Sequence, residues 1–185
     1  MDASPATTGA LLVCIDMQPV FINAMPDAER VLNRCTFAIA AARGLGVPVA
    51  FTEQVPQKLG ATEESLRALS LDSPVYAKDT FSALDDTSFA TALTAHKIEH
   101  LLLCGVETSI CVYQTAIGAI SAGYAVTVLS DAVSARRSDD ARTCLETLVR
   151  AGVHVLPSET VFYSLLRHVR HPFFKAYTQL VKSHG

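Results

Sequence analysis

Short apolar runs recur along the chain and alternate with longer amphipathic stretches. The runs span residues 10–15, 47–51, 98–104, 124–129 and 153–156, and three of them follow directly on Gly46, Gly123 and Gly152. A glycine just past the end of a helix supplies the left-handed conformation that closes it. Because the runs are nearly continuous rather than alternating, they predict parallel strands that are covered on both faces.

The stretches between the runs have the period of a helix. After Ser138, a good N-cap followed by two acidic residues, the apolar positions fall on one helical face. These positions are Ala141, Cys144, Leu145, Leu148 and Val149. Comparable patterns predict helices near 27–45, 62–69, 86–96, 111–122, 159–167 and 172–183. Strand and helix alternate from end to end, so we predict an α/β fold with a three-layer αβα architecture. Its sheet is expected to be parallel, doubly wound and Rossmann-like, with about six strands.

Length and charge narrow the class of protein. The chain has 185 residues, half of them hydrophobic, which suits a single domain over 1–185 with a short flexible tail at about 1–8. No apolar stretch approaches the roughly 20 residues that a membrane helix needs. The 15 Lys and Arg residues against 18 Asp and Glu residues give a net charge of −3, which does not favour binding of a polyanion such as a nucleic acid. We therefore expect a small-molecule substrate, with no membrane and no nucleic acid among the partners.

The cysteines and the N-terminus indicate a compartment. Five cysteines is an odd number, and none has a CxxC or Cys/His metal spacing. Free thiols in a reducing compartment, with no metal and no cofactor, explain them most simply. The first residues contain neither a basic region nor a long apolar segment. We expect a cytoplasmic protein, and import into an organelle through an atypical signal stays open as an alternative.

Residues that can do chemistry follow several predicted strands, where ligands of open parallel sheets bind. Asp16 follows the first run, Lys78 follows a short run at 75–77, and Cys111 follows the turn after the run that ends at 104. A helix N-terminus and a nearby ammonium favour the thiolate of a cysteine, and a carboxylate can accept its proton. Together these residues suggest attack by Cys111 on a carbonyl substrate, with backbone N–H groups of the turn at the oxyanion.

Each residue also has a structural interpretation. A single cysteine after a strand is more often packed than reactive, Asp16 alone is as typical of a helix cap, and Lys78 alone is typical of a solvated charge. The other four cysteines fall inside strand runs or on helix faces and are predicted to be small core residues: Cys14, Cys35, Cys104 and Cys144. Glu53 and Gln54 follow the second run, either as pocket residues or as part of an ordinary loop, and Asp131 follows the fifth.

Three motifs together resemble the isochorismatase-like cysteine hydrolases. They are residues 12–18 (LVCIDMQ) with Phe21, residues 78–83 (KDTFSA) and residues 104–112 (CGVETSICV). They occur in the order and spacing of the family, and the resemblance covers nearly the whole chain. It is greatest to the branch of isochorismatase-domain proteins whose substrate is unassigned.

The resemblance implies a catalytic triad of Asp16, Lys78 and Cys111. It also implies a cis peptide bond between Val106 and Glu107, which would aim the backbone amides of Glu107 and Cys111 at the oxyanion. The family further implies a homo-oligomer, either a dimer or a tetramer.

The resulting functional hypothesis is a cysteine hydrolase that cleaves an amide or related C–N bond of a small molecule through a thioester-type intermediate. The expected pocket residues are Gln18, Phe21, Glu53, Gln54, Phe81 and Thr108. Nicotinamidases of the family hold a metal with histidines, whereas residues 51–77 contain none, so neither that metal nor that activity is expected. Two alternatives stay open: a vinyl-ether hydrolase of isochorismate-like substrates that uses Asp16 as the acid, and a catalytically silent binding or scaffold protein.

Overall fold

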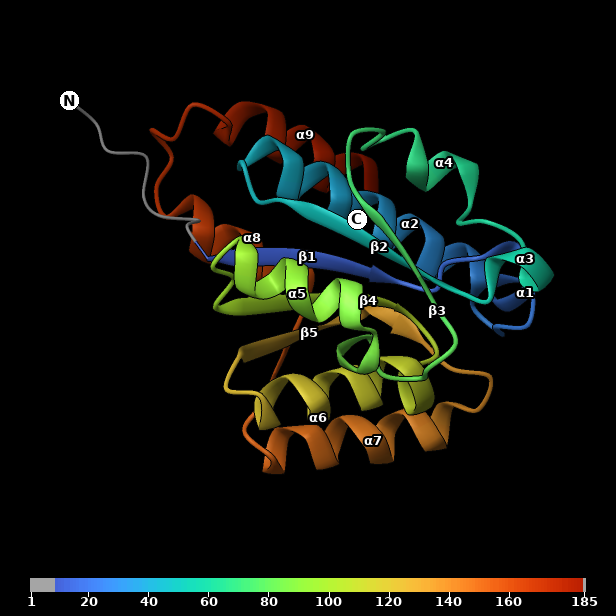
Figure 1. Cartoon of the computed structure of the whole chain (residues 1–185). Helices are drawn as coiled ribbons and strands as arrows, with labels where there is room; N and C mark the ends of the chain where they lie inside the picture. Colours follow the sequence, from blue (N-terminus) through green and yellow to red (C-terminus); the bar gives the residue numbers. More distant parts are fainter. Residues whose placement is uncertain (1–8, 185) are drawn as a thin grey trace.

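The computed structural model describes residues 9–184, so the predicted tail at 1–8 lies outside the described residues. Six strands form one parallel sheet in the order β3-β2-β1-β4-β5-β6 (Figure 1). They are β1 (Ala10–Ile15), β2 (Val49–Gln54), β3 (Val75–Lys78), β4 (His100–Val106), β5 (Ala125–Ser134) and β6 (His154–Leu156). The predicted α/β fold is confirmed, because the strand order reverses direction across β1 and β4 as in other doubly wound sheets.

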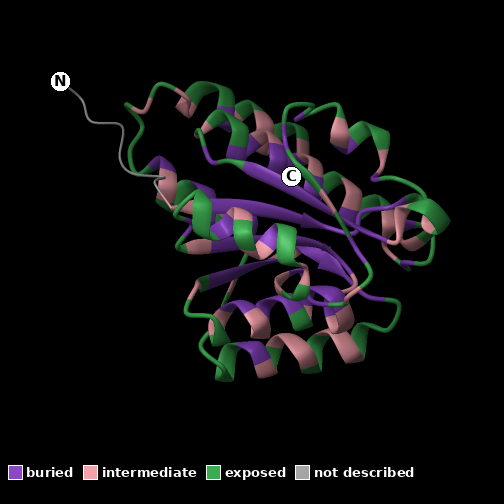
Figure 2. Ribbon diagram, in the orientation of Figure 1, coloured by how far each residue is buried: buried purple, intermediate pink, exposed green. Residues whose placement is uncertain are grey.

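Helices cover both faces of the sheet (Figure 1). One face carries α2 (Ala28–Gly44), α8 (Ser158–Leu166) and α9 (Phe174–His184), and the other carries α5 (Thr87–Ala95), α6 (Tyr113–Ser121) and α7 (Ser138–Arg150). The shorter elements are α1 (Pro19–Ile22), α3 (Pro56–Leu59), α4 (Glu64–Arg67), the 3₁₀ turn η1 (Ala83–Asp85) and the π-helical turn η2 (Thr108–Val112). The four inner strands are mostly buried, and the helices turn exposed residues outward (Figure 2).

Each face of the sheet has its own apolar core. The C-terminal aromatic residues belong to one of them: Tyr177 of α9 is fully buried, and its ring centroid lies 5.8 Å from that of Phe37 on α2. On the opposite face, Phe89 of α5 stacks edge-to-face on Tyr76 of β3. Within residues 9–184, no helix combines the length and the apolar character needed to cross a membrane.

The strand register brings several carboxyl ends together at one edge of the sheet. Ile15 pairs with Thr52 on one side and with Gly105 on the other, and Gln54 pairs with Lys78. Gly105 has a φ of +111°, and a Cβ there would lie 2.1 Å from the carbonyl oxygen of Ile15. Only glycine permits this close approach of β1 and β4. The ends of β1, β2, β3 and β4 therefore form a single edge.

Two strands are longer than the apolar runs predict. β2 continues through Glu53 and Gln54, so these residues lie in the strand rather than after it. β5 continues to Ser134, so Asp131 lies inside it. The polar end of β2 pairs with β3, and the end of β5 pairs with β4. Such pairing depends on tertiary context rather than on the polarity of the residues themselves.

Two helical predictions change in a similar way. The helix predicted at 62–69 is reduced to the short α4. The helix predicted to open at Cys111 begins earlier, with η2, and becomes regular only at Tyr113. Cys111 therefore lies inside a π-helical turn, a feature that often occurs at functional sites.

Candidate active site

Asp16 directly follows β1, and its side chain is buried inside the protein. Its φ of 49° lies in the left-handed region, which Asp tolerates better than most residues. The Thr52 hydroxyl donates to Oδ1 at 2.6 Å, and the Lys78 ammonium donates to Oδ2 at 2.7 Å. Each carboxylate oxygen is therefore held by a separate donor, which fixes the plane of the carboxylate.

Lys78 ends β3 and is also buried. Besides the bond to Asp16, its Nζ donates to Oε1 of Gln54 at 2.5 Å and to the carbonyl of Thr80 at 3.1 Å. An ammonium has three donors, and all three are used here. Burying the Lys78–Asp16 pair is tolerable because each charge faces the other and has further hydrogen bonds.

The side chain of Gln18 holds the backbone of Gln54 in place by hydrogen bonds. Its Oε1 accepts the backbone N–H of Gln54 at 2.7 Å, and its Nε2 donates to the Gln54 carbonyl at 3.1 Å and to the Gly60 carbonyl at 2.6 Å. This reciprocal pair fixes the end of β2. The side chain of Gln54 is then free to accept from Lys78.

Cys111 lies in η2, which begins two residues after β4, and is buried. The pKa of its thiol is raised to about 12, chiefly because of burial and then because of the negative charge of Asp16. Lys78 and a backbone hydrogen bond from Glu107 act in the opposite direction but are outweighed. The thiol of the free protein therefore carries its proton at neutral pH. The sequence predicts a thiolate instead. It shows that a lysine is available, but not that the ammonium of this lysine is already hydrogen-bonded to Asp16.

The turn before Cys111 has an unusual backbone. The peptide bond between Val106 and Glu107 is cis, as the resemblance implies. The Glu107 carbonyl accepts the N–H groups of Ile110 at 3.0 Å and of Val112 at 3.2 Å. These bonds close the turn around Cys111 and hold it beside the end of β1.

A cavity of about 260 Å³ opens at this edge of the sheet. Its lining includes the carboxylate residue Asp16 and the thiol residue Cys111, together with a mostly apolar wall. The lining residues are Asp16, Phe21, Ala24, Met25, Gln54, Phe81, Val106, Glu107, Ile110, Cys111 and Arg136. Lys78 lies behind Asp16 rather than on the wall. A small substrate in this cavity would meet the acid and the thiol together.

The family model of the isochorismatase domain matches residues 10–160. The chain belongs to the isochorismatase domain family. Isochorismatase family protein 1B of Dictyostelium discoideum is 31% identical over 95% of this chain and 86% of its own length.

Solved structures share the fold of this chain. MAR1 ribonuclease from Caenorhabditis elegans has a TM-score of 0.91 and 29% identity, covering 99% of this chain and 95% of its own. The YcaC gene product from Escherichia coli, described as an octameric hydrolase of unknown specificity, has a TM-score of 0.84 and 22% identity. It covers 95% of this chain and 93% of its own.

In this isochorismatase-family chain, three of the predicted pocket residues line the cavity: Phe21, Gln54 and Phe81. The other three are not part of its lining. Gln18 lies behind Gln54, and the Glu53 carboxylate accepts from the N–H of Thr62 at 2.7 Å and from its hydroxyl at 2.8 Å. Thr108 is fully buried. Glu53 points away from Gln54 because successive residues of a strand face opposite sides of the sheet.

The sequence prediction missed Arg136, which follows β5 and lines the cavity. Its Nε donates to Oε2 of Glu107 at 2.8 Å, and 56% of its side chain is exposed. The prediction placed the end of this strand near Asp131, which instead accepts from Arg34 at 2.8 Å and from the N–H of Ser158 at 2.7 Å. The sequence does not show that β5 extends to Ser134, and this extension places Arg136 at the cavity.

One group of cysteines within the described residues lies close enough to hold a metal. It consists of Cys14, Cys35 and Cys104. These residues belong to the core on one face of the sheet, whereas Cys111 belongs to the core on the other. The group is therefore separate from the cavity.

Proposed function

We propose that this protein is a cysteine hydrolase that cleaves an amide or related C–N bond of a small molecule through a thioester intermediate. The observation that carries the proposal is the shared cavity, in which the Cys111 thiol and the Asp16 carboxylate face the same space. Lys78 keeps the carboxylate in place at 2.7 Å. Asp16, Lys78 and Cys111 then act as one triad.

The raised pKa of the Cys111 thiol supports a first step in which Asp16 acts as the base. Asp16 takes the thiol proton while the sulfur attacks the substrate carbonyl, so that a C–S bond forms and the carbonyl electron pair moves to oxygen. When this pair returns, the C–N bond breaks and Asp16 gives the proton to the leaving amine. Water then attacks the thioester with Asp16 as its base, so that a C–O bond forms and the C–S bond breaks. The acid product leaves, and Asp16 returns the proton to the sulfur.

The oxyanion of this reaction needs donors that are fixed in advance. We assign them to the backbone amides of Glu107 and Cys111. Support comes from the closed turn that holds both residues at the cavity.

The cavity suits a small, partly apolar substrate. Its volume of about 260 Å³ is below the usual range for drug-sized ligands, roughly 300–1,000 Å³. Phe21, Phe81 and Ile110 give it apolar walls, and Arg136 supplies a cation beside Glu107. We propose that Arg136 binds an anionic group of the substrate. A net charge of −3 and a cavity of this size favour such a molecule over RNA, the substrate class that the name of the C. elegans protein indicates for that protein.

The vinyl-ether alternative requires Asp16 as a proton donor to the substrate. In the structure Asp16 accepts a hydrogen bond on each oxygen, from Thr52 at 2.6 Å and from Lys78 at 2.7 Å, and this geometry supports a role as acceptor over a role as donor. The scaffold alternative gives no reason for a buried acid and lysine behind a thiol-lined cavity.

The test is a hydrolysis screen of small amides and ureas, with and without a carboxylate group, on wild type and three variants. We expect turnover by wild type and by the matched control Cys144→Ala, and none by Cys111→Ala or Cys111→Ser. Full activity of Cys111→Ser on a vinyl ether would instead establish the alternative. Salt-sensitive cleavage of RNA that survives Cys111→Ala would contradict the proposal.

We further propose a homo-oligomer in a reducing, cytoplasmic compartment. Support for the oligomer comes from the fold shared with octameric YcaC, and support for the compartment comes from five cysteines that are all free. Size-exclusion chromatography with light scattering tests the oligomer, and a monomer at micromolar concentration would contradict it.

A further inference from the structure

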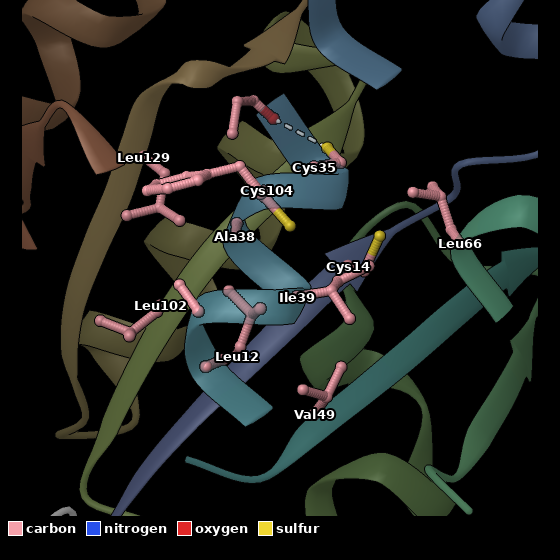
Figure 3. Close-up of a cluster of buried hydrophobic side chains, with 14 of the residues drawn as sticks. Leu12, Cys14, Cys35, Ala38, Ile39, Val49, Leu66, Leu102, Cys104 and Leu129 are labelled. Carbon is pink, nitrogen blue, oxygen red and sulfur yellow. Dashed lines mark hydrogen bonds between the residues drawn. The ribbon is translucent and has the colours of Figure 1, made fainter. Parts of the chain in front are cut away.

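Three thiols meet on one face of the sheet, in the core opposite the one to which Cys111 belongs. Cys14 lies on β1, Cys104 is its direct partner in register on β4, and Cys35 lies above them on α2 (Figure 3). The three sulfur atoms all lie within 4.8 Å of one another, and all three residues are fully buried. Segments distant in sequence thus place three soft donors around one point.

The surroundings of the three thiols are apolar. Side chains such as Leu12, Ile39 and Leu102 pack around them (Figure 3). The Cys35 thiol donates to the carbonyl of Ala132 at 3.3 Å. No histidine, carboxylate or fourth cysteine within residues 9–184 joins the group. The site therefore offers three sulfur ligands and a medium that penalises net charge.

We propose that Cys14, Cys35 and Cys104 form a site for trivalent arsenic taken up as arsenite. A trivalent arsenic centre is pyramidal, so with bonds of about 2.3 Å, the length typical of metal–thiolate bonds, its three sulfurs lie about 3.5 Å apart. The three sulfurs here lie within 4.8 Å of one another, so binding draws them closer together. A trivalent centre with three thiolates is neutral, which suits this core.

The uptake reaction balances without any oxidant. The Cys35 thiol displaces one hydroxide of arsenous acid, and its proton leaves with that hydroxide as water. The thiols of Cys14 and Cys104 each displace one more hydroxide, and each proton leaves with it as water. Three As–O bonds are replaced by three As–S bonds, and arsenic stays trivalent.

Other soft ions fit these donors less well. Zinc prefers four ligands in a tetrahedron, and with three thiolates it would leave one negative charge in the core. Monovalent copper would leave two negative charges with three thiolates. Because α2 covers the site, we expect slow uptake in the native protein, limited by opening of that helix.

The test uses the reduced full chain. After incubation with arsenite and removal of the excess, we expect native mass spectrometry to show one arsenic atom gained for three hydrogens lost. X-ray absorption at the arsenic edge should show three sulfur neighbours and no oxygen. Cys35→Ala should bind about 100-fold more weakly, since one arm of the chelate is lost. The matched controls Cys111→Ala and Cys144→Ala should bind as wild type does.

Several results would overturn the site. They are an oxygen neighbour on arsenic in the wild type, undiminished binding by folded Cys35→Ala, loss of binding in Cys111→Ala, and uptake of zinc or copper by a chain that ignores arsenite. If Cys35→Ala does not fold, the absorption spectrum of the wild-type protein decides alone.

Discussion

Four of the five cysteines lie near the middle strands, and they fall into two very different regions. Cys14, Cys35 and Cys104 are surrounded by aliphatic side chains and by each other. Cys111 lies at the strand ends beside Asp16, where a cavity reaches its thiol. All four are buried, so burial does not distinguish them. The neighbouring groups do: one region offers three sulfurs and no base, and the other offers one sulfur, one base and room for a substrate.

The sharpest way to separate the two regions is to remove one thiol from each. We expect Cys111→Ala to lower kcat by about 10⁶-fold, as loss of a nucleophile does in other hydrolases. Cys35→Ala should leave kcat nearly unchanged and cost about 1 kcal/mol of stability, because it removes one small buried group. Steady-state kinetics and urea unfolding of both variants measure this, and equal kinetic losses would erase the distinction.

The pH dependence of alkylation tests the environment of Cys111 directly. Because the pKa of the Cys111 thiol is raised, the thiol keeps its proton at pH values at which an ordinary cysteine has lost it. The thiolate becomes the major form only near pH 12. Labelling of Cys111 by iodoacetamide should therefore rise about tenfold per pH unit, with no plateau between pH 7 and the limit of native structure. Peptide mass spectrometry after short pulses follows each cysteine, and free glutathione is the reference thiol.

Asp16→Asn provides the matched control for this profile. The substitution removes the negative charge that contributes to the raised pKa of Cys111. The profile of the variant should shift toward lower pH. A wild-type plateau below pH 8 would show an activated resting thiolate and contradict the assignment of the first proton transfer to Asp16.

Lys78→Met tests whether the base depends on its buried partner. The variant leaves the Asp16 carboxylate buried without a counter-charge, so we expect a loss of about 3–5 kcal/mol in the free energy of unfolding at neutral pH. The double variant Asp16→Asn/Lys78→Met should recover most of this loss. Urea denaturation measures the free energy of unfolding. A loss below about 1 kcal/mol in Lys78→Met would mean that Asp16 and Lys78 do not form a buried ion pair.

The smallest expected effect concerns the mouth of the cavity. Arg136→Ala should raise KM for an anionic substrate about tenfold, the value of one charge-assisted contact, while leaving the free energy of unfolding within about 0.5 kcal/mol. Arg137→Ala is the matched control, because Arg137 pairs with Asp140 and does not line the cavity. Equal KM changes in the two variants would remove Arg136 from the specificity of the site.

The sequence predicts the regular parts of this molecule well because they depend on local periodicity. The apolar runs locate all the central strands, and the position of polar residues after them locates Asp16, Lys78 and Cys111. The extension of β5 to Ser134 depends instead on its pairing with β4. That extension is why Arg136 was missed at the cavity.

Side-chain direction and coupling are harder to predict than position. Glu53 and Gln54 are adjacent in sequence, yet one binds Thr62 and the other binds Lys78. The sequence also shows that a lysine is available to Cys111, but not that the lysine is already bound to Asp16. Both outcomes depend on strand register, which brings the partners from distant segments.

The most direct test of the account is to trap the covalent intermediate. Wild-type protein is mixed with a pool of small amides, quenched in acid within one turnover, and analysed by peptide mass spectrometry, with Cys111→Ala as the control. We expect an acyl mass on the peptide that carries Cys111, lost with time as product appears and absent from the variant. Turnover with no such adduct, or an adduct carried by Asp16 instead, would contradict it.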